Sequence, residues 1–599
     1  MRRLRFLSSA LGLGALSLVA PRAQAALTLA SGEPADDLTV TVLANGLAQP
    51  TDMAELPDGR VVITQREGDV VVVDANGDQI ESGHITVYPE FQEQGLLGVV
   101  ADPDFATNHF LYFYASAGTT TEDPVNKHKV YKITLGDDGI LDSARNAIID
   151  KGLRASRQSV DQGASNHNGG GLQIYKGFLY LSVGDSGHNK TPPNNELATC
   201  LNSTNGKILR VKLDGTTPDD NPLSNETQVT GCDDWNEPTK MVAPEKRIFS
   251  WGFRNPYRFW IDSVTSRMWI GDVGETTKEE ISVGSPIDDG GPGSKGEHFG
   301  WPFFEGVEKY TQSFPATTCM DVAPARACIP PVLDYGRTTA TLPLPGETGN
   351  NCIIGGLIPD GCGWAAPWTG RYLFGDNSSG RIWMFDVTPE RDGMVADSLA
   401  DFAKTQGVGS FRMGANGTLY IAEVSGGVVD KITPKNLDTT MCQSGSGGMG
   451  GTGAGGASAG STSTGGIDAG GTGPTSGGNG GTGMVSGGNA TSGGTSGRTG
   501  SGGATTGGTS TAMGGTATAN GGTATGTGGA STGTGGTKAG GTSSTTAGAP
   551  GAGAGGQGSD DKGGCGCRVA GDSRSASWLG LSGLVGLLSL QRRRLRARN

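Results

Sequence analysis

With 599 residues the chain is long enough for several domains, and its composition changes sharply along its length, because more than half of its 105 glycines lie beyond Cys442. The formal charge is −13, and arginines near both ends conceal part of the acidity of the residues between them. An acidic body argues against a nucleic-acid partner, which would need a basic face. No group of cysteines and histidines in the sequence has the spacing of a zinc site.

Residues 1–25 read as a secretory signal peptide. The segment has a basic start, an apolar run and a small-residue cleavage site that ends at Ala25. We expect cleavage after Ala25 and secretion into an oxidising compartment, in which cysteines form disulfides.

Seven cysteines lie before the glycine-rich region. If nearest neighbours pair, they close three loops and leave Cys442 over: Cys200–Cys232, Cys319–Cys328 and Cys352–Cys362. Because connectivity cannot be deduced from spacing alone, other pairings stay open.

Residues 26–442 repeat one pattern of short apolar segments. A segment of the type Gly-x-Leu-Tyr is followed by a turn and by a second segment that ends at Asp-Gly or Asn-Gly. The pattern occurs six times, at residues 59–76, 110–139, 177–215, 266–284, 370–393 and 417–434. Six such units and almost no helical periodicity predict an all-β fold, a six-bladed β-propeller. A β-sandwich is the competing architecture, although it would not ordinarily repeat one hairpin six times.

Two long insertions interrupt this pattern, at residues 219–245 and 306–367. We expect both to be loops on one face of the propeller. Loops on one face of a rigid ring are where such folds place binding sites.

Residues 443–564 consist mainly of Gly, Ser, Thr and Ala and cannot bury enough surface to fold, so we expect a disordered linker. Residues 565–599 combine a Cys-Gly-Cys motif, an apolar run and an arginine cluster. This order resembles the MYXO-CTERM sorting tail of myxobacterial surface proteins. The resemblance implies attachment to the cell surface or outer membrane, or membrane anchorage, through this tail.

The most informative stretch covers residues 166–187 and sets His167 in one glycine-rich turn and Asp185 in another, with an apolar segment between them. If the two turns meet, the pair is a base with a carboxylate that orients it. The alternative is a surface histidine in a polar turn and an ordinary strand-ending turn.

Several segments around this stretch resemble, in order, the soluble PQQ-dependent glucose and sorbosone (aldose sugar) dehydrogenases. The matching segments are Gly-Leu-Leu-Gly at 95–98, Asp-Pro-Asp-Phe at 102–105, Asn-His-Asn-Gly-Gly at 166–170, Val-Gly-Asp at 183–185, Asn-Gly-Lys-Ile-Leu-Arg at 205–210, Gly-Phe-Arg-Asn-Pro at 252–256, Gly-Asp-Val-Gly-Glu at 271–275 and Phe-Gly-Trp-Pro at 299–302. Together they cover nearly all of residues 46–434.

The resemblance implies a reaction and the residues that carry it. His167 would take the proton of the anomeric hydroxyl of an aldose as hydride passes to PQQ, which yields a lactone, and Asp185 would orient His167. Arg254 would hold the quinone C5 oxygen and stabilise the charge that grows there. Asn255 would contact the quinone. An external electron acceptor would reoxidise the cofactor.

The resemblance also implies a metal. Calcium would be bound by the backbone carbonyls of Gly274 and Glu275 and by PQQ itself, and oxygen ligation suits Ca²⁺. The side chains of Asp272 and Glu275 are interpreted as ordinary turn carboxylates, and Trp301 as a packing residue. For Arg254 the alternative is that it braces a blade turn.

The chain departs from the family at three cofactor contacts. Glu93 stands where the family has a PQQ-binding glutamine, so the adjacent Gln94 would substitute only if the turn shifts. Ser378 stands where the family has a lysine, and the paired arginines near the last blade are reduced to Arg412. PQQ carries three carboxylates, so these changes weaken its predicted binding.

The sequence therefore predicts a PQQ- and calcium-dependent sugar dehydrogenase. One alternative keeps the fold without the chemistry: a non-catalytic, calcium-stabilised propeller that binds a glycan or a protein at the cell surface. A second alternative is a lactonase or lyase that uses the calcium on a sugar acid.

Overall fold

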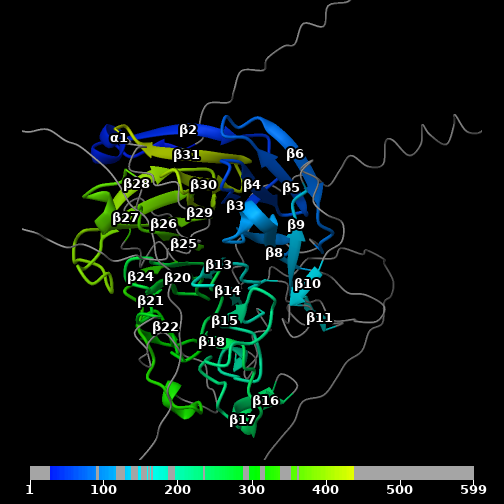
Figure 1. Ribbon diagram of the computed structural model, residues 1–599. Coiled ribbons are helices and arrows are strands. Elements are labelled where there is room, and N and C mark those ends of the chain that lie inside the picture. The colour runs from blue at the N-terminus through cyan, green and yellow to red at the C-terminus, as the bar shows by residue number, and fades with distance from the viewer. Residues whose placement is uncertain are drawn as a thin grey trace, which may run out of the picture. The chain divides into compact units, whose positions relative to one another are not determined.

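The computed structural model describes residues 27–436, apart from 89–92, 117–127, 137–145, 150–157, 160–161, 164–165, 187–195, 234–235, 288–295, 311–317, 338–343, 345–351 and 361–362. The predicted signal peptide, linker and sorting tail lie outside the described residues. Six antiparallel sheets form the blades of a β-propeller (Figure 1), so the predicted fold is confirmed.

The first three blades each contain four strands in one antiparallel sheet. Blade 1 holds β3 (Pro50–Glu55), β4 (Val61–Gln65), β5 (Asp69–Val73) and β6 (Gln79–His84). Blade 2 holds β7 (Leu96–Ala101), β8 (Phe110–Ser116), β9 (His128–Thr134) and β10 (Asn146–Ile149). Blade 3 holds β13 (Leu172–Tyr175), β14 (Phe178–Val183), β15 (Lys207–Lys212) and β18 (Ile248–Trp251).

The other three blades follow the same plan. Blade 4 holds β19 (Arg258–Ile261), β20 (Met268–Asp272), β21 (Lys278–Val283) and β24 (Leu333–Gly336). Blade 5 holds β25 (Ile353–Leu357), β26 (Arg371–Asp376), β27 (Arg381–Asp386) and β28 (Ala400–Lys404), with β1 (Thr28–Leu29) added beside β28. Blade 6 holds β29 (Val408–Met413), β30 (Leu419–Glu423), β31 (Val428–Pro434) and β2 (Leu38–Ala44).

Blade 6 closes the ring with strands from both ends of the described chain. β2 pairs with β31 from Leu38 opposite Pro434 to Ala44 opposite Val429, and the two strands lie side by side in blue and yellow in Figure 1. The first strands of the blades, β3, β7, β13, β19, β25 and β29, contact one another in that order, and β29 contacts β3. A closed ring of sheets leaves no exposed edge along its inner strands.

The six sequence repeats correspond to the second and third strands of the six blades. The prediction for residues 306–367 as one loop is wrong, because this segment contains β24 and β25. β25 reads Ile-Ile-Gly-Gly-Leu, and its two glycines hide the strand pattern. The other insertion, 219–245, carries a hairpin of β16 (Val229–Asp233) and β17 (Asn236–Val242).

The remaining elements are short. They are α1 (Glu33–Asp37), α2 (Phe105–Asn108), β11 (Gln158–Ser159), β12 (Gln162–Gly163), β22 (Phe304–Glu305) and β23 (Glu308–Lys309), with 3-10 turns at Glu196–Ala198, Cys319–Asp321 and Trp368–Gly370. No helix among the described residues is both long and apolar enough to cross a membrane.

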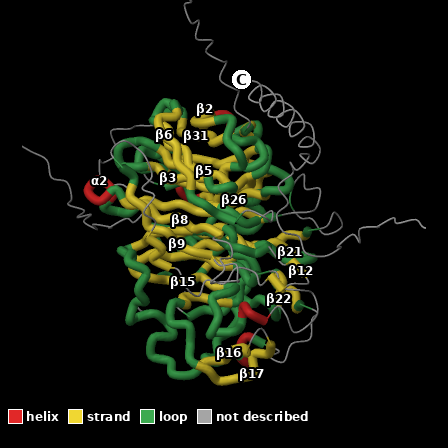
Figure 2. Tube along the Cα trace, turned by 90° about the vertical axis from the view of Figure 1, so that its right-hand side faces the viewer, coloured by secondary structure: helices red, strands yellow, loops and turns green. Residues whose placement is uncertain are grey.

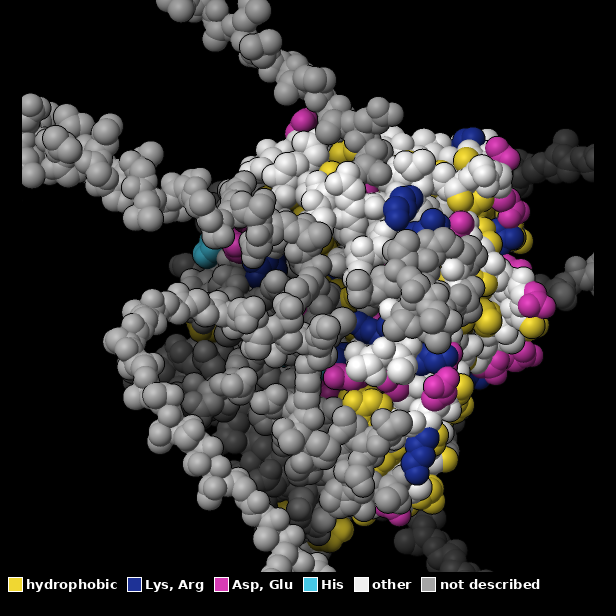
Figure 3. Space-filling model, turned by 180° about the vertical axis from the view of Figure 1, so that it is seen from behind, with side chains coloured by type: hydrophobic (Ala, Val, Ile, Leu, Met, Phe, Trp, Pro, Cys, Tyr) yellow, Lys and Arg dark blue, Asp and Glu magenta, His cyan; other side chains and the backbone are white. Residues whose placement is uncertain are grey.

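The hydrophobic core lies between the blades, which stack face against face (Figure 2). Strands covered on both faces need no polar alternation, and β5 accordingly reads Asp-Val-Val-Val-Val with its four valines buried. β-branched side chains of this kind favour the extended backbone. Lys and Arg are interspersed with Asp and Glu on the coloured part of the face in Figure 3.

The side chains of two arginines connect inner strands of different blades in the middle of the ring by hydrogen bonds. Arg412 on β29 donates to both carboxylate oxygens of Asp52 on β3, at 3.0 and 2.6 Å. Arg258 on β19 donates to the carbonyls of Thr51 and Leu97, at 2.8 and 2.9 Å. Because both partners are buried, each contact satisfies polar groups that water does not reach.

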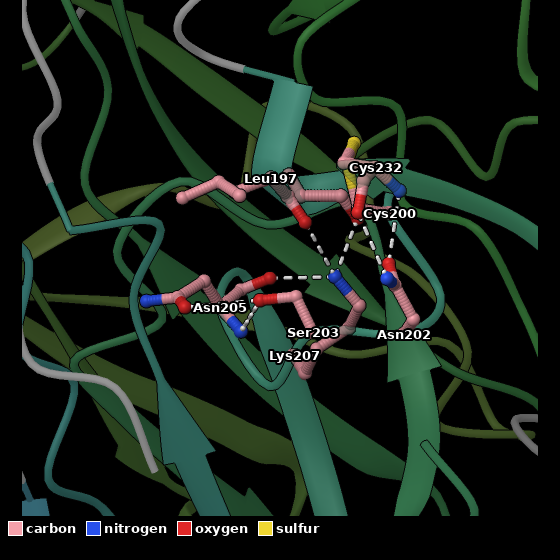
Figure 4. The surroundings of a disulfide bond; sticks show 8 residues. Leu197, Cys200, Asn202, Ser203, Asn205, Lys207 and Cys232 are labelled. Atoms are coloured by element: carbon pink, nitrogen blue, oxygen red, sulfur yellow. Dashed lines mark hydrogen bonds between the residues drawn. A yellow bond between two sulfur atoms is a disulfide. The ribbon is translucent and has the colours of Figure 1, made fainter. Parts of the chain in front are cut away.

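Two of the three predicted disulfides are confirmed, Cys200–Cys232 and Cys319–Cys328. Figure 4 shows the first of them beside the buried Lys207. Cys352 is also disulfide-bonded, while its predicted partner Cys362 and the leftover Cys442 lie outside the described residues.

Candidate active site

The candidate site lies at one edge of blades 2, 3 and 4. In an antiparallel blade, the first and third strands begin at the same edge at which the second and fourth strands end. Gln94 precedes β7, His167 precedes β13 and Arg254 precedes β19, which are all first strands, while Asp185 follows the second strand β14. The topology therefore brings these four residues to one face, which we call the site face.

His167 and Asp185 form a buried pair on the site face. His167 Nδ1 lies 2.6 Å from Asp185 Oδ1, and the two side chains are 3% and 2% exposed. Asp185 Oδ2 accepts a hydrogen bond from Trp301 Nε1 at 3.0 Å. Since a carboxylate only accepts, His167 donates from Nδ1, which leaves a lone pair on Nε2. Nε2 is buried and has no hydrogen-bond partner among the described residues.

A glycine permits the two turns to meet. A Cβ at Gly184 would lie 2.1 Å from the carbonyl oxygen of His167, so any other residue would push the turns apart. His167 itself has a φ of 59°, in the left-handed region that non-glycine residues rarely adopt. The backbone N–H of Asp185 donates to the carbonyl of Arg254 at 2.7 Å, which fixes the second turn against blade 4.

Lys207 supports the turn that carries Asp185 through Asn205. Its Nζ donates to the carbonyls of Leu197, Ala198 and Asn205, at 2.8, 2.9 and 2.5 Å (Figure 4). Asn205 Nδ2 in turn donates to the carbonyl of Gly184 at 3.2 Å. Complete burial lowers the pKa of Lys207 well below its usual value.

Glu93 contacts His167, and the neighbouring Gln94 has a different environment. The Glu93 carboxylate is half-buried and accepts the backbone N–H of His167 at 2.5 Å. The Gln94 side chain is fully buried, and neither amide atom has a hydrogen-bond partner among the described residues. An orphaned buried amide costs free energy unless a ligand satisfies it.

Arg254 is held by the turn that follows β20. Its Nε and Nη2 donate to Glu275 Oε2, at 2.8 and 2.5 Å, and its Nη1 donates to the carbonyl of Val273 at 3.0 Å. Burial alone would raise the pKa of Glu275, but the charge of Arg254 lowers it to about 2. Arg254 and Glu275 therefore form a charged pair, and the guanidinium lies 5.9 Å from the ring centre of Trp301.

Asp272 and Asn255 order the same region. The Asp272 carboxylate accepts the backbone N–H groups of Arg254 and Asn255, at 2.9 and 2.6 Å. Asn255 Oδ1 accepts the N–H of Gly169, at 3.0 Å, in the turn that carries His167. Burial raises the pKa of Asp272 to about 7. Asp272 thus positions the Arg254 backbone and Glu275 holds the Arg254 side chain, which are structural roles.

One of the two predicted calcium ligands, the carbonyl of Gly274, has another partner. Arg337 Nη1 donates to the carbonyl oxygen of Gly274 at 2.5 Å, and the carboxylate of Glu279 pairs with the same nitrogen. A guanidinium on this oxygen repels a second cation. No group of three or more His, Cys, Asp or Glu residues that could hold a metal ion occurs in the described part of the chain. Because Arg337 already donates to the Gly274 carbonyl, this oxygen does not fit calcium.

Comparison with known proteins decides the family. The family model for glucose/sorbosone dehydrogenases matches residues 47–341, which include His167, Asp185, Arg254 and Gly274. The chain belongs to the glucose/sorbosone dehydrogenase family.

Three curated relatives are 23–27% identical to the chain. They are the uncharacterized protein slr1608 of Synechocystis (27% over 54% of this chain and 74% of that protein), the aldose sugar dehydrogenase YliI of Escherichia coli (27%, 44% and 62%) and the quinoprotein glucose dehydrogenase B of Acinetobacter calcoaceticus (23%, 45% and 53%). The chain thus spans less than two thirds of each of the two named sugar dehydrogenases.

Two solved structures of sugar dehydrogenases align with the propeller. The apo aldose sugar dehydrogenase of Escherichia coli is 21% identical, with a TM-score of 0.48 over 66% of this chain and 100% of that chain. The PQQ-bound aldose sugar dehydrogenase of Streptomyces coelicolor is 20% identical, with a TM-score of 0.46 over 66% and 98%.

The two other cofactor positions of the family differ in place: Ser378 follows the second strand of blade 5, at the site face, whereas Arg412 does not lie there. Ser378 is exposed in the turn between β26 and β27. Arg412 lies near the end of β29, away from the edge where that strand begins, and its guanidinium pairs with Asp52. The sequence could not show this pairing because Arg412 and Asp52 are 360 residues apart.

Three side chains of the site were not predicted from the sequence. Trp301 was assigned to packing, yet its indole N–H holds Asp185. Arg337 and Glu305 were missed. Glu305 Oε1 accepts the backbone N–H groups of residues 275–278 and so shapes the turn that holds Arg254. Arg337 directly follows the fourth strand β24, which was not predicted from the sequence.

Replacement of Gln94 tests whether its side chain is reserved for a ligand. Gln94→Leu should raise the free energy of unfolding of the ligand-free protein by about 1–3 kcal/mol, because it removes two orphaned buried polar atoms. The matched control is Gln65→Leu, which should lower it, since Gln65 Oε1 accepts the N–H of Ala48 at 2.5 Å. Urea unfolding measures both, and a destabilised Gln94→Leu would show that the amide already has protein partners.

Proposed function

We propose that the propeller binds PQQ and oxidises the anomeric carbon of an aldose to a lactone, with His167 as the general base. One observation carries the proposal: His167 Nδ1 is held by Asp185 while the buried Nε2 has no hydrogen-bond partner among the described residues. The names of the relatives, an aldose sugar dehydrogenase and a quinoprotein glucose dehydrogenase, support the reaction and the cofactor.

The residues on the site face suit a polar quinone cofactor. The orphaned amide of Gln94 and the orphaned Nε2 of His167 each offer a hydrogen bond to a ligand. Arg254 supplies a buried positive charge whose position is fixed by Glu275 and by the carbonyl of Val273. When bound there, PQQ would accept the hydride that leaves the anomeric carbon.

The chain's own residues handle the proton. Asp185 keeps the proton of His167 on Nδ1 and so leaves Nε2 to take the proton of the anomeric hydroxyl. Trp301 holds the second oxygen of Asp185, so neither ring nor carboxylate has to reorient as charge develops on the imidazole. Burial of His167 and Asp185 keeps water away from both groups and strengthens their interaction.

The second candidate is a propeller that binds a glycan or protein without catalysis. It is favoured by Glu93, whose carboxylate would repel the carboxylates of PQQ. The structure gives Glu93 another task, since it accepts the N–H of His167 and supports its left-handed backbone.

The experiment loads the purified protein with PQQ and follows dye reduction with a panel of aldoses. His167→Ala should lower turnover by a factor of about 10² to 10⁴ with cofactor binding retained, because the proton then has no acceptor. Asp185→Asn should also lower turnover, since an amide can donate to Nδ1 and so favour the wrong tautomer.

His84→Ala is the matched control, because this exposed histidine pairs with Asp69 on blade 1. It should leave turnover unchanged. Unchanged turnover of His167→Ala would contradict the role of His167, and absence of any saturable PQQ binding would favour the second candidate.

We also propose that the protein is exported and tethered at the cell surface through its C-terminal tail. The predicted signal peptide and tail support this, as do the two described disulfides, which suit an oxidising compartment. Protease treatment of intact cells should degrade the propeller, and full protection in intact cells would contradict surface exposure.

A further inference from the structure

The turn after β20 presents consecutive carbonyl oxygens to two guanidinium groups. The Val273 carbonyl accepts from Arg254 at 3.0 Å, and the Gly274 carbonyl accepts from Arg337 at 2.5 Å. The backbone N–H groups of the next four residues point to Glu305 instead. In this turn, four backbone N–H groups donate to one carboxylate, and two carbonyl oxygens accept from guanidinium groups.

Arg337 is fixed at this turn by its own surroundings. Its side chain is 3% exposed, and its Nη1 also pairs with the fully buried carboxylate of Glu279. Glu279 Oε2 accepts the N–H groups of Gly274 and Ile353, at 3.3 and 3.1 Å. The backbone N–H of Arg337 donates to the carbonyl of Thr277 at 2.9 Å. These contacts hold the guanidinium on the Gly274 carbonyl.

One nitrogen of this guanidinium is unused. Arg337 Nη2 is buried and has no hydrogen-bond partner among the described residues. A buried N–H group of a cation that lacks a partner is costly, and a ligand oxygen with negative charge would satisfy it.

We propose that Arg337 takes the place of calcium at the Gly274 carbonyl and offers Nη2 to a carboxylate or carbonyl oxygen of PQQ. This inference rests on the proposed function. Arg337 supplies a fixed positive charge where a calcium ion would supply one, and it needs none of the six to eight oxygen ligands that calcium requires. PQQ binding to this chain is therefore independent of Ca²⁺.

The test measures PQQ binding by the full chain with and without calcium. PQQ is titrated into metal-free protein in the presence of EGTA, and again with excess Ca²⁺, and quenching of tryptophan fluorescence reports binding. The dissociation constants should agree within a factor of about 2, a difference of less than 0.5 kcal/mol.

Arg337→Ala should raise the dissociation constant for PQQ in EGTA by a factor on the order of 10 to 100, because a charge-assisted hydrogen bond is lost. Since this change leaves Glu279 buried without its cation, the double variant Arg337→Ala/Glu279→Gln provides a neutral version that is expected to fold. The control is Arg391→Ala, which removes an arginine that is 12% exposed and pairs with Asp262 and Asp360 away from the site face.

The outcomes separate this inference from the proposed function. PQQ binding that appears only with Ca²⁺ would overturn the inference and leave the dehydrogenase proposal intact. Binding that resists EGTA but is the same in both Arg337 variants as in the wild type would overturn the role of Arg337. Failure to bind PQQ under either condition would overturn both.

Discussion

The pairing of β2 with β31 closes the ring of blades, and the positions of the site residues depend on this closure. Residues from the first and last blades meet in the middle of the ring, where Asp52 accepts from Arg412. Arg258 likewise joins blade 4 to blades 1 and 2. Removal of one partner would leave a buried charge without compensation, so these contacts fix the mutual positions of the inner strands. The turns on the site face adjoin these strands, so their positions are fixed as well.

Burial strengthens the electrostatic interactions of the charged groups in the site. Arg254 and Arg337 are each almost fully buried, and both hold one carboxylate and one carbonyl of the same segment. In a site from which water is excluded, fixed charges act more strongly on a ligand than they would at the surface. Under the proposed function, these two buried cations would compensate for the family's lysine, which Ser378 replaces here.

Much of the fold could be predicted because the second and third strands of each blade are apolar and joined by recognisable turns. β25 and β24 were missed, since one is rich in glycine and both are short. In the site, His167 and Asp185 could be predicted because each lies in a glycine-rich turn that is visible in the sequence. Trp301 and Arg337 could not, because their contacts depend on how an insertion and a fourth strand fold back against distant turns.

The most direct test of the account is the reduction of bound PQQ in a single turnover. Protein loaded with PQQ is mixed rapidly with an aldose that carries deuterium at the anomeric carbon, and the absorbance of the cofactor is followed. We expect slower reduction than with the unlabelled sugar, and no slowing when deuterium is at C2, because hydride leaves the anomeric carbon. Absence of reduction by any aldose, or an equal rate with both labels, would contradict it.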